Sequence, residues 1–300
     1  MRLTAIVLGA AAGGGFPQWN CNCDVCRLAW AGDARVRPRT QASLAVSGDG
    51  RHWTLLNASP DLRAQLQVTP ALQPRGGTRG SPIEAVVLTG GEIDQTAGLL
   101  SLRERSPFAL IATAATRAAV ADNPMFGALA SDMVARRAIT PGEKFALGGN
   151  LQAELFMVPG KVPLYLEGLN PQTAEESAAN VGVEISDGRT RLAYVPGAAA
   201  MTPALKARLA RADAILFDGT LYTDDEMIRS GTGSKTGRRM GHMPIEGPDG
   251  SLAALADVKA RRIFVHINNT NPMLVDGSPE RVRVNAAGWD VAWDGMEIVL

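Results

Sequence analysis

The chain is poor in the residues that usually cross-link or ligate, with only three cysteines and three histidines in 300 residues. Three cysteines cannot all pair within one chain, and Cys21, Cys23 and Cys26 lie too close together for ordinary disulfides. We therefore expect reduced thiols and a cytoplasmic location. Histidines occur only at positions 52, 242 and 266, so a site that needs several imidazoles has few candidates.

An excess of charge and a long apolar run are also missing. Thirty basic and thirty acidic residues give a formal net charge of zero, so no global field attracts nucleic acid or an anionic membrane. No apolar stretch is long enough to span a bilayer. We therefore expect neither a nucleic acid nor a membrane as partner. Apolar residues at 46% and charged residues at 20% are ordinary for a soluble globular enzyme.

The first residues admit two interpretations. Met1-Arg2 followed by the apolar run Leu3 to Ala12 resembles a short signal peptide. The same run is also what a buried first strand over Leu3 to Leu8 would look like. We favour the strand, because Ile6-Val7-Leu8 has high β-propensity.

Strand and helix patterns alternate along most of the chain. They predict an α/β fold, either a four-layer α/β/β/α sandwich or a doubly wound sheet. The patterns predict helices over Thr96 to Glu104 and around Ala128 to Val134. They predict a hairpin of Val181 to Ser186 with Arg191 to Val195, and a strand pair around Asp294-Gly295. Buried strands are expected over Ile83 to Leu88, Ala214 to Phe217 and Arg262 to Val265.

The strongest local motif is Cys21-Asn22-Cys23-Asp24-Val25-Cys26. Three thiolates at this spacing can converge on one Zn²⁺, which prefers a tetrahedral set of four ligands. A fourth ligand must come from elsewhere in the chain. The alternatives are three unrelated buried residues or a redox pair of Cys23 and Cys26, although no thioredoxin-type strand and helix surround them. A closed zinc site of this kind is structural.

A Gly-rich loop with two carboxylates and an amide, Glu92, Asp94 and Gln95, follows the buried strand that ends at Leu88. Polar groups at this position are where α/β folds place chemistry. The alternative is purely structural: Asp94 caps a helix that starts at Thr96, and Glu92 is solvated.

Later strands deliver further donors. Asp218 ends one buried strand and His266 follows another, while His242 lies in Gly241-His242-Met243-Pro244. Together with Glu92 and Asp94 these residues would make an oxygen and nitrogen site suited to Fe(II), Mn(II) or Zn(II). The segment Ile228 to Met240 is rich in glycine and in bases, and could close on an anionic ligand.

Several motifs resemble one family over essentially the whole chain, the coenzyme PQQ synthesis protein B family within the metallo-β-lactamase fold superfamily. The resemblance implies the four-layer sandwich as a single domain over residues 1–300. The motifs are Leu8 to Cys23, Leu88 to Leu99, Val158 to Tyr165, Tyr194 to Gly197, Gly241 to Pro244 and His266 to Pro272.

The chain departs from the superfamily pattern at its metal ligands. The superfamily loop reads His-x-His-x-Asp-His, and two more ligands, a His and an Asp, would fall near positions 160–161 and 197, where this chain has glycines and Lys161. Too few imidazoles remain for a dizinc hydrolase. The four loop positions are occupied by Gly90, Glu92, Asp94 and Gln95.

The resemblance implies a role in pyrroloquinoline quinone (PQQ) synthesis, as an iron-dependent hydroxylase of the tyrosine ring in a cross-linked Glu–Tyr diamino acid. The alternatives are a carrier of PQQ or an intermediate, and a residual hydrolase. PQQ or its precursor, other pathway proteins and a second copy of the chain are the expected partners. Catalytic candidates are Glu92, Asp94, Gln95, Asp218 and His242; substrate-binding candidates are Ser59, Arg63, Lys161, Arg238 and Arg239.

His266 is a candidate ligand for two different metal sites. His266 can complete the cysteine zinc site or bind the catalytic Fe²⁺ with Glu92 and Asp94, but it cannot serve two distant metals. Related phosphodiesterases carry His-x-x-His here, one histidine for each site, whereas this chain has His266 and Asn269. We expect His266 to complete the zinc site with Cys21, Cys23 and Cys26.

Overall fold

Two mixed β-sheets form the centre of the molecule in a computed structural model that describes residues 2–168 and 172–300. Each sheet contains seven strands, antiparallel along one half and parallel along the other. The first sheet has the order β14 (Glu297–Val299), β1 (Thr4–Gly9), β2 (Ser43–Ser47), β3 (Trp53–Leu56), β4 (Ile83–Val87), β5 (Phe108–Ala112) and β6 (Val134–Ala138).

The second sheet repeats this arrangement with the last half of the chain. Its antiparallel half runs from β7 to β10 and its parallel half from β10 to β13. The order is β13 (Trp289–Val291), β12 (Arg261–Val265), β11 (Ala214–Asp218), β10 (Arg191–Val195), β9 (Glu175–Ser186), β8 (Leu151–Gly160) and β7 (Lys144–Leu147).

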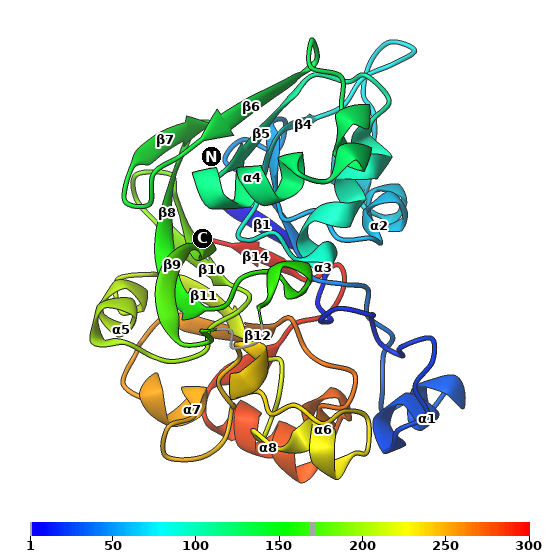
Figure 1. The fold of residues 1–300 in the computed structure, drawn as a ribbon, viewed down its shortest axis with the longest axis vertical. Coiled ribbons are helices and arrows are strands. Elements are labelled where there is room, and N and C mark those ends of the chain that lie inside the picture. The colour runs from blue at the N-terminus through cyan, green and yellow to red at the C-terminus, as the bar shows by residue number, and fades with distance from the viewer. Residues whose placement is uncertain (1, 169–171) are drawn as a thin grey trace.

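Short helices cover the outer faces of both sheets (Figure 1). The α-helices are α1 (Asp24–Trp30), α2 (Leu62–Val68), α3 (Ile93–Thr96), α4 (Ala114–Ala121), α5 (Pro203–Leu209), α6 (Glu226–Arg229), α7 (Ser251–Ala254) and α8 (Pro279–Ala286). The 3₁₀ helices are η1 (Pro70–Leu72), η2 (Ala97–Leu102), η3 (Pro124–Ala128), η4 (Leu164–Leu166), η5 (Arg238–Met240) and η6 (Pro272–Leu274).

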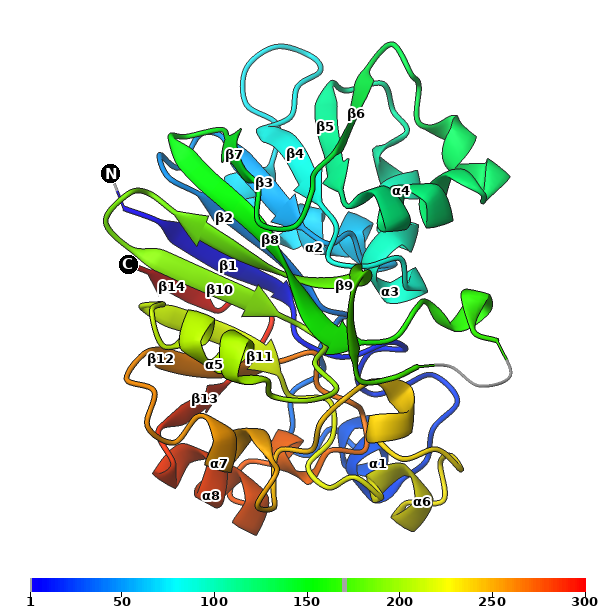
Figure 2. The ribbon, with the colours of Figure 1, turned by 60° about the vertical axis from the view of Figure 1, so that its left-hand side comes forward.

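Three hydrophobic cores separate four layers. The central core lies between the sheets and includes Leu44 of β2 and Leu216 of β11. A second core packs Leu205 of α5 and neighbouring helices on the outer face of the second sheet. A third packs Leu62 of α2 and Val120 of α4 on the first sheet. Figure 2 shows α5, α7 and α8 near β11, β12 and β13 of the second sheet, and α4 near β5 and β6 of the first. The predicted α/β/β/α sandwich is therefore confirmed.

The sheets place polar loops at a common edge. Strands β10, β11 and β12 are parallel, so their carboxyl ends deliver Gly197, Asp218 and His266 to the same side of the second sheet. The loop after β4 meets them from the first sheet. An isolated bridge between Gly90 and Asn180 ties that loop to β9. The same edge thus receives segments that are far apart in the sequence.

Several local predictions were right and three were wrong. The strand at the N-terminus and the 181–195 hairpin are confirmed as β1 and as β9 with β10. No helix covers Ala128 to Val134: η3 ends at Ala128, and Val134 begins an edge strand, β6. The strands around Asp294-Gly295 do not pair, because β13 and β14 belong to opposite sheets.

The third error concerns the helix after the Gly-rich loop. It begins at Ile93 rather than at Thr96, as the short helix α3, and continues as the 3₁₀ helix η2. Asp94 therefore lies in the first turn and is not the N-cap, a position taken by Glu92. Within the described part of the chain, no helix has the length and hydropathy needed to cross a membrane.

Candidate metal centre and cleft

A cavity of about 450 Å³ opens at this common edge of the two sheets. The lining includes Asp94, His242 and His266, here called the floor, and Lys161 and Glu167, here called the far wall. Apolar side chains also line the cavity, among them Ile93, Pro163, Leu164, Met227 and Met240. The cavity therefore combines titratable groups with a partly apolar wall, as small-molecule sites do.

His266 lies at the centre of the cleft. It directly follows β12 and has a φ of 58°, a left-handed backbone conformation that is unusual for a residue with a side chain. Its Nε2 lies 2.9 Å from Asp94 Oδ2, and its Nδ1 lies 2.8 Å from Thr220 Oγ1. The turn thus directs the imidazole towards the loop of the opposite sheet.

Asp218 contacts the second histidine of the cleft, His242. Its Oδ2 is 2.7 Å from His242 Nδ1 and accepts a hydrogen bond from Ala198 N at 2.8 Å. Its Oδ1 accepts from the Thr220 hydroxyl at 2.6 Å. The Asp218 side chain is fully buried, so it orients its neighbours rather than meeting a substrate directly.

The two imidazole rings lie together. The ring centroids of His242 and His266 are 5.2 Å apart with an interplanar angle of 21°. Donor atoms of Asp218, His242 and His266 all lie within 4.8 Å of one another. Asp94 lies next to this group, with its Oδ2 2.9 Å from His266 Nε2. The two imidazoles and Asp218, with Asp94 beside them, offer nitrogen and oxygen donors that fit a divalent first-row metal such as Fe(II), Mn(II) or Zn(II).

The electrostatics of this group are those of buried ion pairs. Burial alone would raise the pKa of Asp94, but the hydrogen bond and charge of His266 lower it below its usual value. Burial likewise opposes the charged form of His266, yet Asp94 and Asp218 raise its pKa. The pKa of Asp218 is lowered by His242 against its own desolvation. Carboxylates kept ionised in a buried site are suited to bind a cation.

The structure does not bring Glu92 into this group. Its carboxylate instead accepts hydrogen bonds from Lys161 Nζ at 2.8 Å and from Leu164 N at 3.1 Å. The expectation that Glu92 is a metal ligand is therefore not supported by the geometry. Lys161 holds the carboxylate on the cleft wall, away from the two imidazoles.

Gln95 has a structural role at the start of α3. Its Oε1 accepts from Glu92 N at 3.3 Å, and the side chain is buried. A Cβ at Gly90 would lie only 2.5 Å from this oxygen. The amide thus occupies the space that a side chain at position 90 would need. This geometry favours capping over catalysis for Gln95.

A second amide fills the site of another absent ligand. A Cβ at Gly160 would lie 2.2 Å from Asn180 Nδ2. That nitrogen donates to the carbonyl oxygens of Val158 and Gly197, each at 3.2 Å. Because Asn180 crosses the space beside Gly160, no side chain from position 160 can reach the cleft without a shift. The cleft is built for fewer metal ligands than the superfamily pattern holds.

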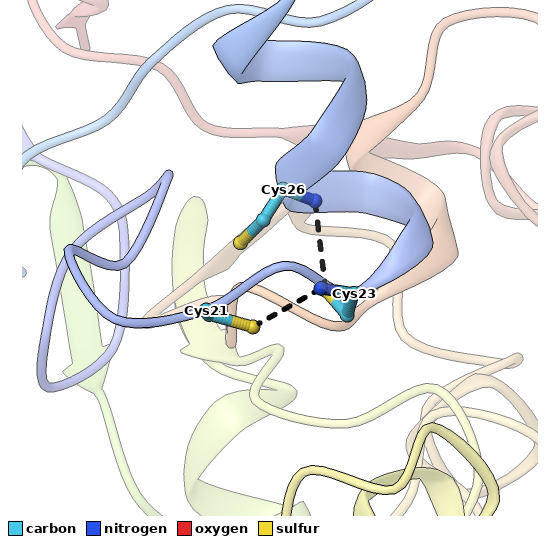
Figure 3. A group of neighbouring side chains, drawn as sticks. All are labelled: Cys21, Cys23 and Cys26. Atoms are coloured by element: carbon cyan, nitrogen blue, oxygen red, sulfur yellow. Dashed lines mark hydrogen bonds between the residues drawn. The ribbon is translucent and has the colours of Figure 1, made fainter.

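The three thiols converge as expected. Figure 3 shows Cys21, Cys23 and Cys26 at the start of α1, and their sulfur atoms lie within 4.8 Å of one another. Burial raises the pKa of Cys23 to about 12, and burial also raises that of Cys26. Buried thiols that ionise reluctantly on their own suit a cation that stabilises the thiolates. The donor set therefore fits Zn²⁺.

The geometry does not support His266 as the fourth ligand of this set, because its imidazole lies in the other group. Asn269 faces the thiols instead, with its Nδ2 3.1 Å from Cys21 Sγ and 3.2 Å from Cys26 Sγ. Asn269 lies only three positions after His266, and the tight turn after β12 points the two side chains to different sites. One short segment thus serves both clusters.

The substrate-binding candidates separate into two groups. Lys161 lines the cleft, and Arg239 reaches its wall by an ion pair with Glu167. Ser59 is fully buried and donates its hydroxyl hydrogen bond to Gln65 Oε1. Arg63 on α2 and Arg238 on η5 are exposed and are not part of the cleft lining. The structure therefore does not support Ser59, Arg63 or Arg238 as substrate contacts.

Four polar residues in or beside the cleft and the cysteine cluster were not among the candidates predicted from the sequence. Thr220 contacts both imidazoles, and Glu167 lines the cleft. Asn180 and Asn269 replace expected ligands with amides. Of these, Thr220 could have been found, because it follows Asp218 at the end of a buried strand. The other three come from loops or strands whose orientation no local pattern gives.

Comparisons with known proteins agree with this architecture. Residues 52–267 match the model of the beta-lactamase superfamily domain. A new diphosphatase from the PhnP family shares the fold, with a TM-score of 0.70 at 21% identity over the whole chain and 98% of that structure. Fold and site together define a metallo-β-lactamase-type domain whose ligand set is altered.

Relatives of higher sequence identity identify the family within this superfamily. The chain is 56% identical over 296 residues to coenzyme PQQ synthesis protein B of Methylorubrum extorquens, covering 98% of this chain and 99% of that one. It is 58% identical over 299 residues to the protein of the same name from Methylobacterium nodulans, covering 99% and 100%. The chain belongs to the coenzyme PQQ synthesis protein B family.

A solved structure supports the same assignment. The crystal structure of Zn²⁺-bound PqqB from Methylobacterium extorquens has a TM-score of 0.98 and 55% identity, and the match covers 99% of this chain and all of that one.

Proposed function

We propose that the protein acts in PQQ synthesis as an iron-dependent hydroxylase of the tyrosine ring in a cross-linked Glu–Tyr diamino acid. Membership of the family supports the pathway. The observation that supports the reaction is the group of Asp218, His242 and His266, with Asp94 beside it, next to an open cleft. Asp94, Asp218, His242 and His266 would hold the metal, which supplies activation of O₂ when bound.

The cleft offers a position for the aromatic ring. Side chains of Leu164, Met227 and Met240 line it beside the metal cluster. Thioethers and aliphatic groups pack well against aromatic faces and exclude water from the reacting carbon. Basic groups on the far wall face the carboxylates that an amino-acid-derived substrate carries.

The residues around His266 form a route for protons. His266 Nδ1, the Thr220 hydroxyl and Asp218 Oδ1 are linked by contacts of 2.8 and 2.6 Å. When the imidazole is protonated, its Nδ1–H donates to Thr220, and the hydroxyl donates to the carboxylate. This series of hydrogen bonds can hold or release a proton at the His266 imidazole without contact with bulk water.

The reaction replaces an aryl C–H bond by C–OH with one oxygen atom of O₂. The other oxygen atom leaves as water, which requires two electrons and two protons from an added reductant. We expect oxygen consumption with the diamino acid and ascorbate in the iron-loaded protein, and its loss in Asp94→Ala. Turnover unaffected by removal of iron would contradict the proposal.

A carrier role is the alternative, and the filled spaces at Gly90 and Gly160 favour it, because they remove ligands that hydrolysis in this superfamily uses. A carrier would bind PQQ tightly and show no oxygen consumption with any divalent metal. We propose in addition a structural Zn²⁺ at Cys21, Cys23 and Cys26, supported by the donor set and by the zinc-bound relative.

A further inference from the structure

Three cations surround one carboxylate at the far wall of the cleft. Lys161 Nζ lies 2.8 Å from Glu167 Oε1. Arg239 Nη1 and Lys235 Nζ lie 3.4 and 4.0 Å from Glu167 Oε2. The Glu167 side chain is only 8% exposed. This carboxylate therefore sits inside the cleft as an anion among bases.

The carboxylate and the cations come from different segments. Lys161 follows β8, Lys235 and Arg239 belong to the basic segment before and within η5, and Glu167 follows η4. The segment of Glu167 is held independently, because Leu164 N donates to Glu92 and the Tyr165 hydroxyl donates to Gly91 O at 2.7 Å. The Glu167 side chain can therefore leave while its segment stays attached.

The geometry around Glu167 is imperfect. Oε1 is shielded from solvent, yet it makes no hydrogen bond of acceptable angle with any residue of the described ranges, 2–168 and 172–300. Its contact with Lys161 has the distance of an ion pair but not the direction of a good hydrogen bond. A carboxylate from outside could satisfy these donors better.

The charges around Glu167 also favour binding of an external carboxylate. Two carboxylates, Glu92 through Lys161 and Glu167, face the three cations, which leaves one positive charge in excess. If the Glu167 carboxylate swung out, two positive charges would remain uncompensated in a partly desolvated wall, a state that favours binding of an anion.

We propose that Lys161, Lys235 and Arg239 form a carboxylate-binding site, which Glu167 occupies until a polycarboxylate ligand displaces it. The identity of that ligand as a PQQ precursor rests on the proposed function, whereas the existence of the site does not. Lys161 is 12% exposed, so it offers its charge to the cleft and not to bulk solvent.

The test uses binding and no chemistry. Benzene-1,3,5-tricarboxylate is titrated into the zinc-loaded, iron-free protein by calorimetry at constant ionic strength, with the neutral tricarboxamide as a control ligand. Glu167→Gln removes the internal competitor and is expected to tighten binding about tenfold, whereas Lys161→Met and Arg239→Gln weaken it about tenfold.

Arg238→Gln is the matched control, because Arg238 has the same charge, lies one position away and is exposed. Its affinity is expected to stay within twofold of wild type. An equal or weaker affinity in Glu167→Gln would overturn the proposal, and so would an equal loss in Arg238→Gln and Arg239→Gln.

Glu167→Asp guards against a folding defect, because it keeps the charge but withdraws the carboxylate by one methylene. It is expected to bind the tricarboxylate more tightly than wild type and less tightly than Glu167→Gln, and weaker binding than wild type would contradict the model. Since no iron or oxygen is used, failure of the hydroxylase proposal leaves these outcomes unchanged.

Discussion

His266 Nε2 lies 2.9 Å from Asp94 Oδ2, although 172 positions separate the two residues in the sequence. Asp94 follows the last strand residue of β4 by seven positions, and His266 directly follows β12, so the pair joins the edges of the two sheets. The contact links a carboxylate and an imidazole at the floor of the cleft. Its properties therefore report on the integrity of the proposed metal centre.

Asp94→Asn tests two roles of Asp94, the raising of the His266 pKa and the binding of the metal. Because Asp94 raises the pKa of His266, the histidine in Asp94→Asn should titrate at a lower pH in the metal-free protein, as measured by NMR of the imidazole protons. Loss of the anionic donor should weaken Fe(II) binding by about 10- to 100-fold. Asp257→Asn, at an exposed carboxylate, should change neither quantity.

Thr220→Val tests the hydroxyl that touches both imidazoles. The substitution keeps the shape but removes contacts of 2.8 Å to His266 and 3.1 Å to His242. We expect metal affinity to fall about tenfold, since partners that orient metal-binding histidines have effects of this size. Thr190→Val, in the turn between β9 and β10, removes a comparable hydroxyl contact far from the cleft. Equal losses in the two variants would contradict an orienting role for Thr220.

The cysteine cluster should behave independently of the cleft. Cys23→Ser should lose bound zinc and unfold at a lower temperature, because a structural zinc contributes directly to folding. Asp94→Asn should keep that zinc. Mass-spectrometric metal analysis together with thermal unfolding checks both, and a full zinc complement in Cys23→Ser would contradict the assignment.

Asn269→Ala examines the residue that faces the thiols in place of the expected histidine. Its amide lies within 3.2 Å of two of the three sulfur atoms. We expect zinc to bind about tenfold more weakly than in wild type, with the metal centre of the cleft intact. Competition with a chromogenic chelator measures the zinc affinity.

Glu226 predicts a pH dependence of stability. Burial raises its pKa from 4.5 to about 7, and the hydrogen bonds it accepts from Thr270 and Tyr222 offset that effect only in part. A raised folded-state pKa means that the folded protein holds the proton between these values. The stability lost to ionisation of Glu226 therefore grows as the pH rises from 4.5 through 7.

Glu226→Gln removes this cost. It should raise the free energy of unfolding by about 3 kcal/mol at pH 8 and by about 1 kcal/mol at pH 5. Urea unfolding of the zinc-saturated proteins at both pH values checks the difference. A gain that is the same at both pH values would show that the pKa of Glu226 is not raised in the folded protein.

The fold and part of the site could be predicted because they rest on local patterns. Apolar runs such as Ile83 to Val87 mark buried strands regardless of context, and polar residues directly after them fall at strand ends. Asp94 and Asp218 were identified in this way, and His242 was identified as one of only three histidines; the three lie near one another in the structure. The cysteine spacing likewise defines its cluster within one loop and the start of α1.

The remaining features depend on where side chains point in the folded protein, which no local sequence pattern gives. His266 and Asn269 are three positions apart, and the turn between them, which begins with a positive φ at His266, points only Asn269 at the thiols. Glu92 had the right chemistry for a metal, but Lys161, which follows β8, pairs with its carboxylate instead. Val134 became part of an edge strand because β5 offers it a parallel partner in Phe108, which no helix pattern reveals.

The most direct test of the account is the fate of labelled oxygen. Iron-loaded protein is mixed with the Glu–Tyr diamino acid, ascorbate and ¹⁸O₂, and the product is examined by mass spectrometry. We expect one ¹⁸O atom in the aromatic ring of the product, and no incorporation with Asp94→Ala. Label absent from the product of the wild-type protein, or equal incorporation by the variant, would contradict it.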